Sequence, residues 1–276
     1  MRRENIPLNS DIVNIKLISV KPSFLMYPLP LLKIGHKFKW KARFIVGTGY
    51  LYALCFNGQE AKTSFRELKK VLSTNSTSRV QELLNEIETL NRYVSSLVGS
   101  EHPEKFVKTS KNGTEIELIL PQDFSLIEDN RAVGFFPVPK ISFLMPTSAQ
   151  AKALYIYLHY LKNRDNPIVT TSANRLGKDL RLDRKKVKKY LSELEEVNAI
   201  SFESNRNFLK VIIKTPVHWK KEAFVKMIKI YGEKHPFMKD WEFDCTNRPQ
   251  SGAPIDPNQA DRCTNRPQPC TNRPQP

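Results

Sequence analysis

The stretch TSANRLGKDLRLDRKKVKKYLSELEEVNAI, residues 171–200, decides the fold that we expect for this chain. Its apolar side chains repeat at helical spacing on both sides of a short polar turn: Leu176 and Leu180, then Val187, Leu191 and Leu194. Apolar residues three and four apart lie on one face of a helix. The stretch therefore predicts two short helices joined by a tight turn, each with one buried face.

The second predicted helix combines an N-cap with a cationic surface. Asp183 stands just before it, where a carboxylate can accept the unpaired amide hydrogens of the first turn. The residues opposite and beside its apolar stripe are polar and mostly cationic: Arg184, Lys185, Lys188, Lys189 and Ser192. A helix with a buried rear and a cationic front, held by a shorter helix, is typical of a helix-turn-helix.

A β-hairpin is predicted directly after this pair of helices. Two apolar runs, residues 200–202 and 208–213, flank a polar tip at residues 203–207. A hairpin behind a DNA-reading helix makes the unit a winged helix, so the expected fold class is α+β. The residues expected to contact DNA in this unit are Arg175, Lys178, Arg184, Lys185, Lys188, Lys189, Ser192 and, at the hairpin tip, Arg206.

Charge and composition also favour a polyanionic partner. The chain has 276 residues, a formal net charge of +16 and a hydrophobic share of 40%. That share is adequate for packed cores, and the basic excess fits nucleic acid better than a small acidic substrate. The alternative is a generally basic surface without a partner. The N-terminus lacks the apolar core of a signal peptide, and no membrane span is expected. Four cysteines without zinc-site spacing indicate reduced thiols and a cytoplasmic protein.

The N-terminal half repeats the same order of patterns. Residues 50–56, 65–72 and 77–94 read as helices, and residues 105–120 read as a hairpin with Asn112-Gly113 suited to a type I′ turn. On the last of these helices, Val80, Leu84 and Ile87 form the apolar face. We interpret the two halves as tandem winged helices. The alternative is one winged helix beside an unrelated α+β domain.

The two predicted copies differ in charge. The exposed positions of the first copy's third helix are polar or acidic: Ser78, Gln81, Glu82 and Asn85. The second copy is therefore the better groove reader. The first copy reads DNA weakly, contacts phosphates through Lys108 and Lys111 of its hairpin, or forms a dimer surface.

The predicted organisation has five parts. Residues 1–30 form an N-terminal arm, 31–122 the first winged-helix-like domain, 123–145 a connector, 146–240 the second domain and 241–276 a disordered tail. Residues 36–44 alternate as a strand with a cationic side, suited either to phosphates or to protecting a sheet edge. Residues 147–150 read as a capping box that starts a helix, and residues 217–231 read as a basic helix packed on the second domain.

The tail repeats CTNRPQP at residues 263 and 270, a period of seven residues, or about 21 bp of coding DNA. That is close to two turns of the duplex, so the gene itself could carry directly repeated binding sites. The alternative is a functionless product of slippage, and repeats that differ at synonymous positions would exclude the hypothesis.

Enzyme signatures are missing from the sequence. Gly177-Lys178-Asp179 lacks the other residues of a phosphate-binding loop, and the five histidines are isolated. Tyr190 lies beside an apolar stripe and is interpreted as a core residue rather than a nucleophile. We therefore expect no catalysis, no cofactor and no metal.

A family resemblance narrows the function. VPKISFLMPTSAQAKALYIYL at residues 138–158, LGKDL at 176–180 and VKKYLSELE at 187–195 resemble the N-terminal winged helix of plasmid replication initiators and phage replisome organisers. The tandem arrangement and the tail repeat are similar to iteron-binding theta-type plasmid initiators. The resemblance covers about residues 138–214. It implies a protein that binds directly repeated sites in double-stranded DNA, opens an AT-rich region and recruits the host replicative helicase or its loader. It also adds a homodimer to the expected partners.

The expected function is thus replication initiation at repeated origin sites without catalysis. A winged-helix transcriptional regulator is the first alternative and would bind a promoter palindrome. A relaxase or primase is the second, and nicking of supercoiled plasmid with a divalent metal would support it.

Overall fold

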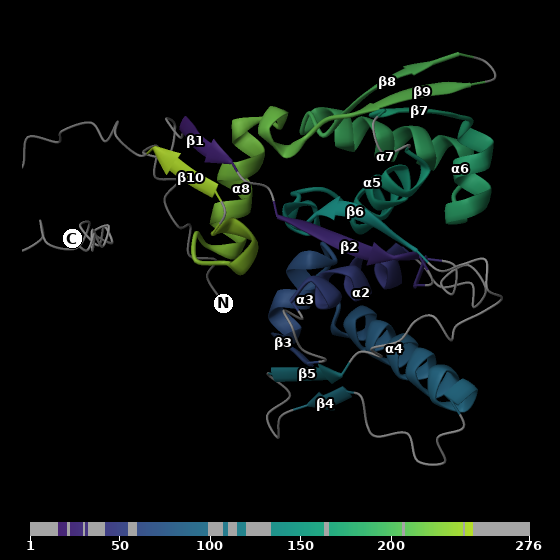
Figure 1. The fold of residues 1–276 in the computed structure, drawn as a ribbon, viewed down its shortest axis with the longest axis vertical. Coiled ribbons are helices and arrows are strands. Elements are labelled where there is room, and N and C mark those ends of the chain that lie inside the picture. The colour runs from purple at the N-terminus through teal and green to yellow at the C-terminus, as the bar shows by residue number, and fades with distance from the viewer. Residues whose placement is uncertain are drawn as a thin grey trace, which may run out of the picture. The chain divides into compact units, whose positions relative to one another are not determined.

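The C-terminal half is built around the helices that the sequence predicts. A computed structural model describes residues 16–20, 23–29, 31–32, 42–54, 60–98, 107–109, 115–119, 134–162, 166–205, 208–239 and 241–244. The elements of the C-terminal half are β6 (Phe135–Pro139), a 3-10 helix (Lys140–Leu144), α5 (Ala149–Leu161), β7 (Ile168–Thr171), α6 (Ala173–Leu180), α7 (Arg184–Glu196), β8 (Ile200–Ser204) and β9 (Leu209–Ile213). The last two strands confirm the predicted hairpin, and β7 pairs with β9 to give an antiparallel sheet of order β7-β9-β8 (Figure 1).

The N-terminal half has the same order of elements. They are β2 (Phe24–Pro28), α2 (Ala42–Leu54), β3 (Glu60–Ser64), α3 (Phe65–Val71), α4 (Thr77–Val98), β4 (Val107–Thr109) and β5 (Glu115–Ile119). Their sheet has the order β3-β5-β4, which matches β7-β9-β8 strand for strand. Thr109 pairs with Ile116 and Lys108 with Glu117, the register of a hairpin centred on positions 112 and 113. The chain is therefore a mixed α+β protein in which one order of helices and small antiparallel sheets occurs twice.

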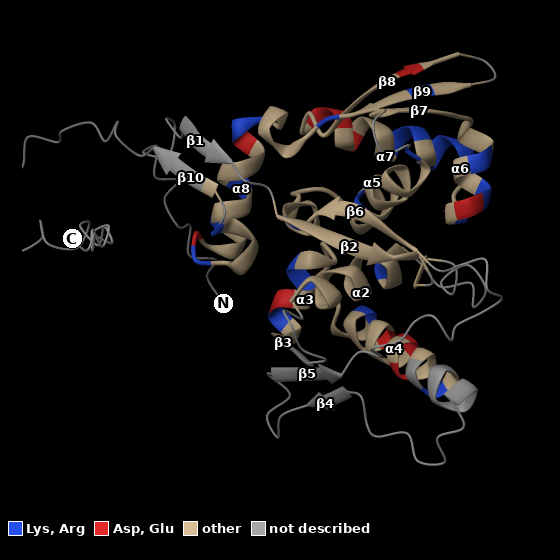
Figure 2. Cartoon of the chain, in the orientation of Figure 1, with Lys and Arg blue, Asp and Glu red and all other residues tan. Residues whose placement is uncertain are grey.

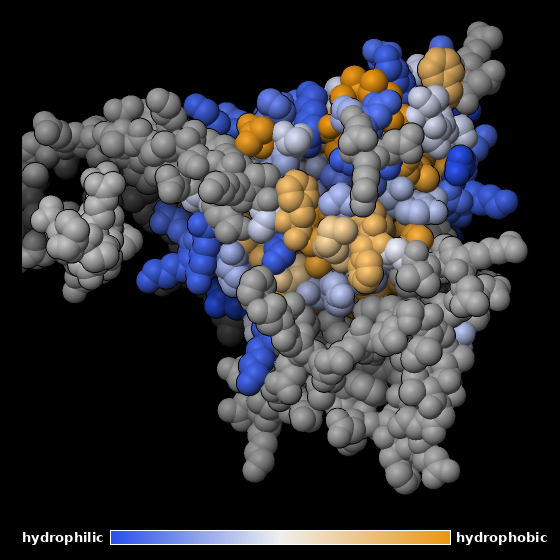
Figure 3. Space-filling view, in the orientation of Figure 1, coloured by the Kyte–Doolittle hydropathy of each residue, from blue (hydrophilic) through white to orange (hydrophobic). Residues whose placement is uncertain are grey.

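A two-stranded ribbon joins the halves. Strand β2 pairs antiparallel with β6, and Met26 lies opposite Pro137 at the centre of the register. Tyr27 is fully buried beneath the ribbon and donates a hydrogen bond to the Ile45 carbonyl at 3.0 Å. The outer face stays apolar, with Phe24 and Met26 about half exposed, and Figure 3 shows apolar side chains gathered there.

This ribbon occupies residues that the sequence analysis places in an arm and a connector. The prolines in both segments argue against a strand at the level of sequence. Proline has no amide hydrogen to donate to a neighbouring strand, so it is tolerated only in the edge strands of a sheet. In a ribbon of two strands each strand is an edge, so the prolines fit. Residues 24–28 and 135–139 are parts of the fold rather than linkers.

The predicted strand over residues 36–44 is wrong at its C-terminal end, where Ala42, Arg43 and Phe44 begin α2. Residues 36–41 lie outside the described residues. An almost continuous apolar run follows Arg43 and is buried on nearly all sides, which favours a central helix over an alternating strand. Gly49 allows close packing, because a Cβ there would lie 2.6 Å from the Tyr27 ring and 2.7 Å from the Phe143 ring.

Polar bonds also connect the halves, close to the packed helices α2 and α5. The Lys152 side chain is buried in α5, and its Nζ donates to the Val71 carbonyl of α3 at 2.7 Å. Ser73 Oγ donates to the Thr147 carbonyl at 2.6 Å. Burial lowers the pKa of Lys152 to about 7, because the charged ammonium loses its water.

The C-terminal elements pack on both halves. The predicted basic helix begins at Lys221 rather than at residue 217, and α8 (Lys221–Tyr231) buries Phe224 and Met227. It contacts α3, with Lys70 Nζ 5.6 Å from the centre of the Tyr231 ring, so its packing is not confined to the second half as predicted. Strand β10 (Trp241–Asp244) pairs with β1 (Lys16–Val20).

Residues 15–244 form one compact unit by their contacts. Among the residues that the structure describes, no helix combines the length and the apolar character needed to cross a membrane. The predicted disordered tail, residues 241–276, is wrong for residues 241–244, which form β10; its remainder from residue 245 lies outside the described residues. The predicted domain boundaries remain predictions.

Candidate nucleic-acid interface

The turn between α6 and α7 is fixed by local bonds. Ser172 Oγ accepts the Arg175 amide at 3.1 Å and caps α6, and Asp183 Oδ1 accepts the Lys186 amide at 2.8 Å and caps α7. The Leu182 amide donates to the Gly177 carbonyl at 2.8 Å, and a Cβ on Gly177 would collide with the Leu182 carbonyl oxygen. Glycine at this position therefore permits the tight turn, and Asp183 performs the predicted capping role.

The two sides of α7 differ as the sequence predicts. Its rear is buried: Val187, Tyr190, Leu191 and Leu194. Its front is exposed: Arg184, Lys185, Lys188, Lys189 and Ser192. Tyr190 is 8% exposed, which is consistent with a core residue. The α7 front, defined by these five exposed residues, is thus held in place by a packed rear.

Charge runs along α7 in an unusual order. Cations fill its first turns, and Glu193, Glu195 and Glu196 lie at its end, as Figure 2 shows in blue and red. A helix is stabilised by the opposite order, with acids at its N-terminus and bases at its C-terminus. The acids have partners inside the protein: Glu193 accepts from Ser148 Oγ at 2.6 Å, and Glu195 accepts from the Phe202 amide at 3.3 Å.

The cations of the α7 front have few partners. Lys185 and Lys188 form no ion pair with any described residue, and Lys189 Nζ lies 5.9 Å from the centre of the Tyr190 ring. Lys186, at the side of the helix, pairs with Asp183 at 3.0 Å. A hydrogen bond from the Lys186 amide lowers the pKa of the exposed Asp183 carboxyl.

A polar hollow lies where α6, α7 and the β8–β9 hairpin meet. Its volume is about 220 Å³, and it is lined by the starts of both helices and by hairpin residues. Arg184 and Lys188 line one side, Asn174 and Asn205 are polar neighbours, and Phe208 leaves 44% of its surface exposed. Sequence reasoning missed Asn174, Asn205 and Phe208, although an aromatic residue directly after a polar hairpin tip was a usable signal.

The remaining predicted contacts divide between described and undescribed residues. Arg175 and Lys178 are exposed on α6. Arg175 Nε lies 3.9 Å from Asp179, which also accepts a hydrogen bond from Tyr157 at 2.6 Å. Lys108 belongs to β4, but its side chain lies outside the description, as do Lys111 and Arg206. Ser204 pairs with Leu209, so the β8–β9 hairpin is centred on positions 206 and 207.

Helix α4 has the same place in the N-terminal half and a different surface. Its exposed positions Ser78, Gln81, Glu82 and Asn85 agree with the prediction. Gln81 Nε2 donates to Asn85 Oδ1 at 3.2 Å. Glu82 pairs with Arg43 of α2 at 2.6 Å. The cations of α4 are Arg79 and Arg92, of which Arg92 lies 3.7 Å from Glu88, so α4 lacks the run of cations found on the front of α7.

The chemistry of the α7 front is that of a surface for anions. Within the part of the chain that the structure describes, no three His, Cys, Asp or Glu side chains group as a metal site would require. No protein-family model matches the sequence, and no curated protein matches it. The α7 front and the residues that hold it in place are therefore the features that bear on function.

Proposed function

We propose that the chain binds double-stranded DNA through the α7 front and the β8–β9 hairpin, as the second of two winged-helix units. We further propose that it acts as a plasmid-type replication initiator at directly repeated sites, without catalysis of its own. The observation that carries the proposal is the reversed charge order of α7, with cations at its start and acids at its end.

The reversed order has an energetic meaning. A charge of the wrong sign in the first or last turn of a helix costs about 0.3–1 kcal/mol. Arg184 and Lys185 lie in the first turn, so the helix dipole does not account for these cations, although Asp183 caps the same end of the helix. A polyanion bound at this end accounts for the cations, and for Lys185 and Lys188 having no ion pair with a described residue.

The arrangement supports one mode of docking. The first turns of α7 enter the major groove, where Lys185 and Lys188 reach base edges or phosphates. Arg175 and Lys178 of α6 contact the backbone and fix the orientation. The β8–β9 hairpin lies beside the polar hollow of the protein and follows the neighbouring groove of the DNA. Phe208 is exposed toward that groove.

One cationic front per chain supports repeated sites in one direction. Because α4 lacks such a front, the described part of the chain presents one reading helix, without a second one to read the other half of a palindrome. Several chains would then occupy successive direct repeats, each in the same orientation. Origin opening would draw on binding and bending, and smooth bending of a site costs on the order of 1–6 kcal/mol.

The test uses the gene with its flanking DNA, cloned on a plasmid that lacks a replicon. We expect that plasmid to persist in a suitable host, and the protein to protect directly repeated sites from nuclease. Loss of the plasmid with retained protection of a palindrome would instead indicate a transcriptional regulator. Absence of any protection at moderate salt would refute the proposal of DNA binding.

A further inference from the structure

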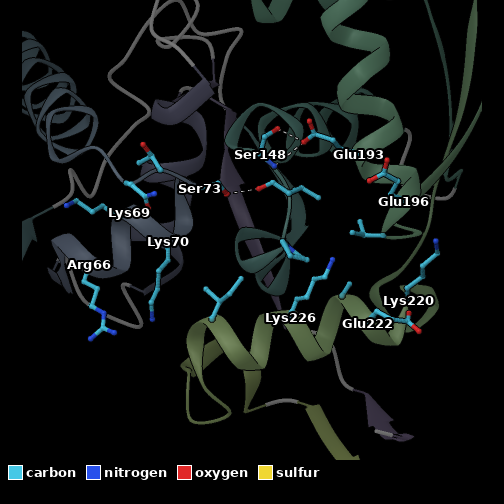
Figure 4. Close-up of a pocket in the computed structure, with 17 residues that line it drawn as sticks. Arg66, Lys69, Lys70, Ser73, Ser148, Glu193, Glu196, Lys220, Glu222 and Lys226 are labelled. Carbon is cyan, nitrogen blue, oxygen red and sulfur yellow. Dashed lines mark hydrogen bonds between the residues drawn. The ribbon is translucent and has the colours of Figure 1, made fainter. Parts of the chain in front are cut away.

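A second cleft lies away from the α7 front. It has a volume of about 800 Å³ and is lined by α3, by the turn before α5, by the end of α7 and by α8 (Figure 4). Glu196 lines it at the C-terminal end of α7, about 18 Å along the helix axis from Arg184. We infer that this cleft is a docking site for an acidic peptide segment of a partner protein. This inference does not rest on the proposed function.

The cleft is preformed because hydrogen bonds tie its walls together. Ser73 Oγ donates to the Thr147 carbonyl at 2.6 Å, which joins the end of α3 to the turn before α5. Ser148 Oγ donates to Glu193 of α7 at 2.6 Å, and the Ser148 amide donates to the same carboxylate at 3.1 Å. A preformed site loses less conformational entropy on binding than a flexible surface does.

Cations outnumber acids among the residues that line the cleft, with Arg66, Lys69, Lys70, Lys220 and Lys226 against Glu193, Glu196 and Glu222. Figure 4 shows Arg66, Lys69 and Lys70 on the α3 side, across from Lys226 of α8. Arg66, Lys69 and Lys226 form no ion pair with a described residue, although Glu222 lies on the same rim. Lys70 is 3.6 Å from Glu67 and is therefore partly neutralised. The α3 side is thus the strongly positive wall.

The floor decides which anion fits. The lining has an apolar part, made of Pro146, Val197, Ala223 and Ile230, of which Ile230 leaves 40% of its surface exposed. The volume falls within the range of about 300–1,000 Å³ that is usual for ligand sites. Duplex DNA presents its phosphates on a convex rod, and its apolar thymine methyl groups lie inside the major groove, away from such a floor. An acidic peptide with one apolar anchor satisfies both surfaces, with its carboxylates toward Arg66 and Lys69.

The test measures fluorescence anisotropy of a labelled short peptide of Asp and Glu around a central Leu-Phe pair, at about 0.15 M NaCl. We expect saturable binding by the full chain and no binding of the Asn/Gln version of the peptide. Arg66→Glu with Lys69→Glu should weaken binding about tenfold or more, because like charges then face each other. Glu222→Lys on the other wall should tighten it.

A matched control carries the same change in charge outside the cleft. Lys221→Glu with Lys229→Glu alters two exposed lysines of α8 that do not line it, and should leave peptide affinity within about twofold of wild type. Equal losses in both double variants, or no peptide binding by the wild-type chain, would overturn the inference. So would loss of duplex binding in the Arg66→Glu and Lys69→Glu variant alone, because the cleft would then be a second DNA contact.

Discussion

Helices α4 and α7 have the same place in the two halves, yet they present different surfaces. Both have a fully buried apolar stripe, which includes Val80 and Ile87 in α4 and Val187 and Leu194 in α7. Both are preceded by a shorter helix with a serine N-cap. The rear of the helix is thus set by packing and is shared, whereas the front is free to differ. The comparison shows which residues the scaffold requires and which it does not.

Acidic residues of both helices hold the first helix of their own half. Glu82 and Glu86 of α4 each lie 2.6 Å from the Arg43 guanidinium at the start of α2. Glu193 of α7 accepts from Ser148, the N-cap of α5. These acids have a structural role in both halves. The lysines of α7 have no counterpart in α4, which makes them the clearest difference between the halves.

The largest expected effect comes from giving α7 the front of α4. Lys185→Ser, Lys188→Gln and Lys189→Glu together place the residues of Ser78, Gln81 and Glu82 on α7. Each lost contact costs about 1–3 kcal/mol, so we expect duplex affinity to fall about a hundredfold or more. The slope of affinity against salt should also become shallower, because fewer counterions are released. Titration of labelled duplex at several salt concentrations measures both.

The control for this variant changes lysines elsewhere by the same chemistry. Lys221→Gln with Lys229→Gln on α8 should leave specific affinity nearly unchanged. If the α7 variant binds as tightly as wild type, α7 is not the reading helix and the difference between α4 and α7 has another cause.

The second largest expected effect is on stability and concerns Lys152. Lys152 is the fourth residue of α5, and the corresponding fourth residue of α2 is Ile45. Burial lowers the pKa of Lys152 to about 7 in the folded chain, against 10.5 as the ordinary value. Above pH 7 the folded chain releases this proton while the unfolded chain retains it. Stability should therefore rise with pH between about 7 and 10.5, by up to about 1.4 kcal/mol per pH unit.

Lys152→Ile removes this titration and makes the position resemble the first half. Urea unfolding of the variant at several pH values should show a shallower rise above pH 7 than wild type. The Val71 carbonyl loses its donor, so some loss of stability at high pH is expected as well. Parallel pH profiles for the two proteins would show that Lys152 stays charged when buried.

The sequence predicts the parts of this fold that depend on local periodicity. The helices α3 to α7, the cap at Asp183 and the front of α7 follow from apolar spacing and capping chemistry. The ribbon of β2 and β6 does not, because its strands lie far apart in the sequence and contain prolines. Strand β3 contains a single apolar residue, Ala61, and β7 has only four residues, so neither shows a clear period.

The same distinction applies to the sites. Exposure of Lys185 and Lys188 can be read from helical spacing. By contrast, the hollow beside Phe208 and the cleft above Val197 arise where segments distant in sequence meet. No pattern within one segment indicates such a meeting.

The smallest expected effect concerns the serine N-caps that begin α3 and α6. Ser64 Oγ accepts the Glu67 amide at 3.1 Å and begins α3, as Ser172 Oγ accepts the Arg175 amide at 3.1 Å and begins α6. Ser64→Ala and Ser172→Ala should each lower the free energy of unfolding by about 1 kcal/mol, since each leaves one amide without its acceptor. Only Ser172→Ala should also weaken duplex binding, because α6 supports the helix that we propose reads DNA and α3 does not. Urea unfolding and duplex titration of both variants test this, and a matching loss of DNA affinity in Ser64→Ala would mean that the first half also contacts DNA.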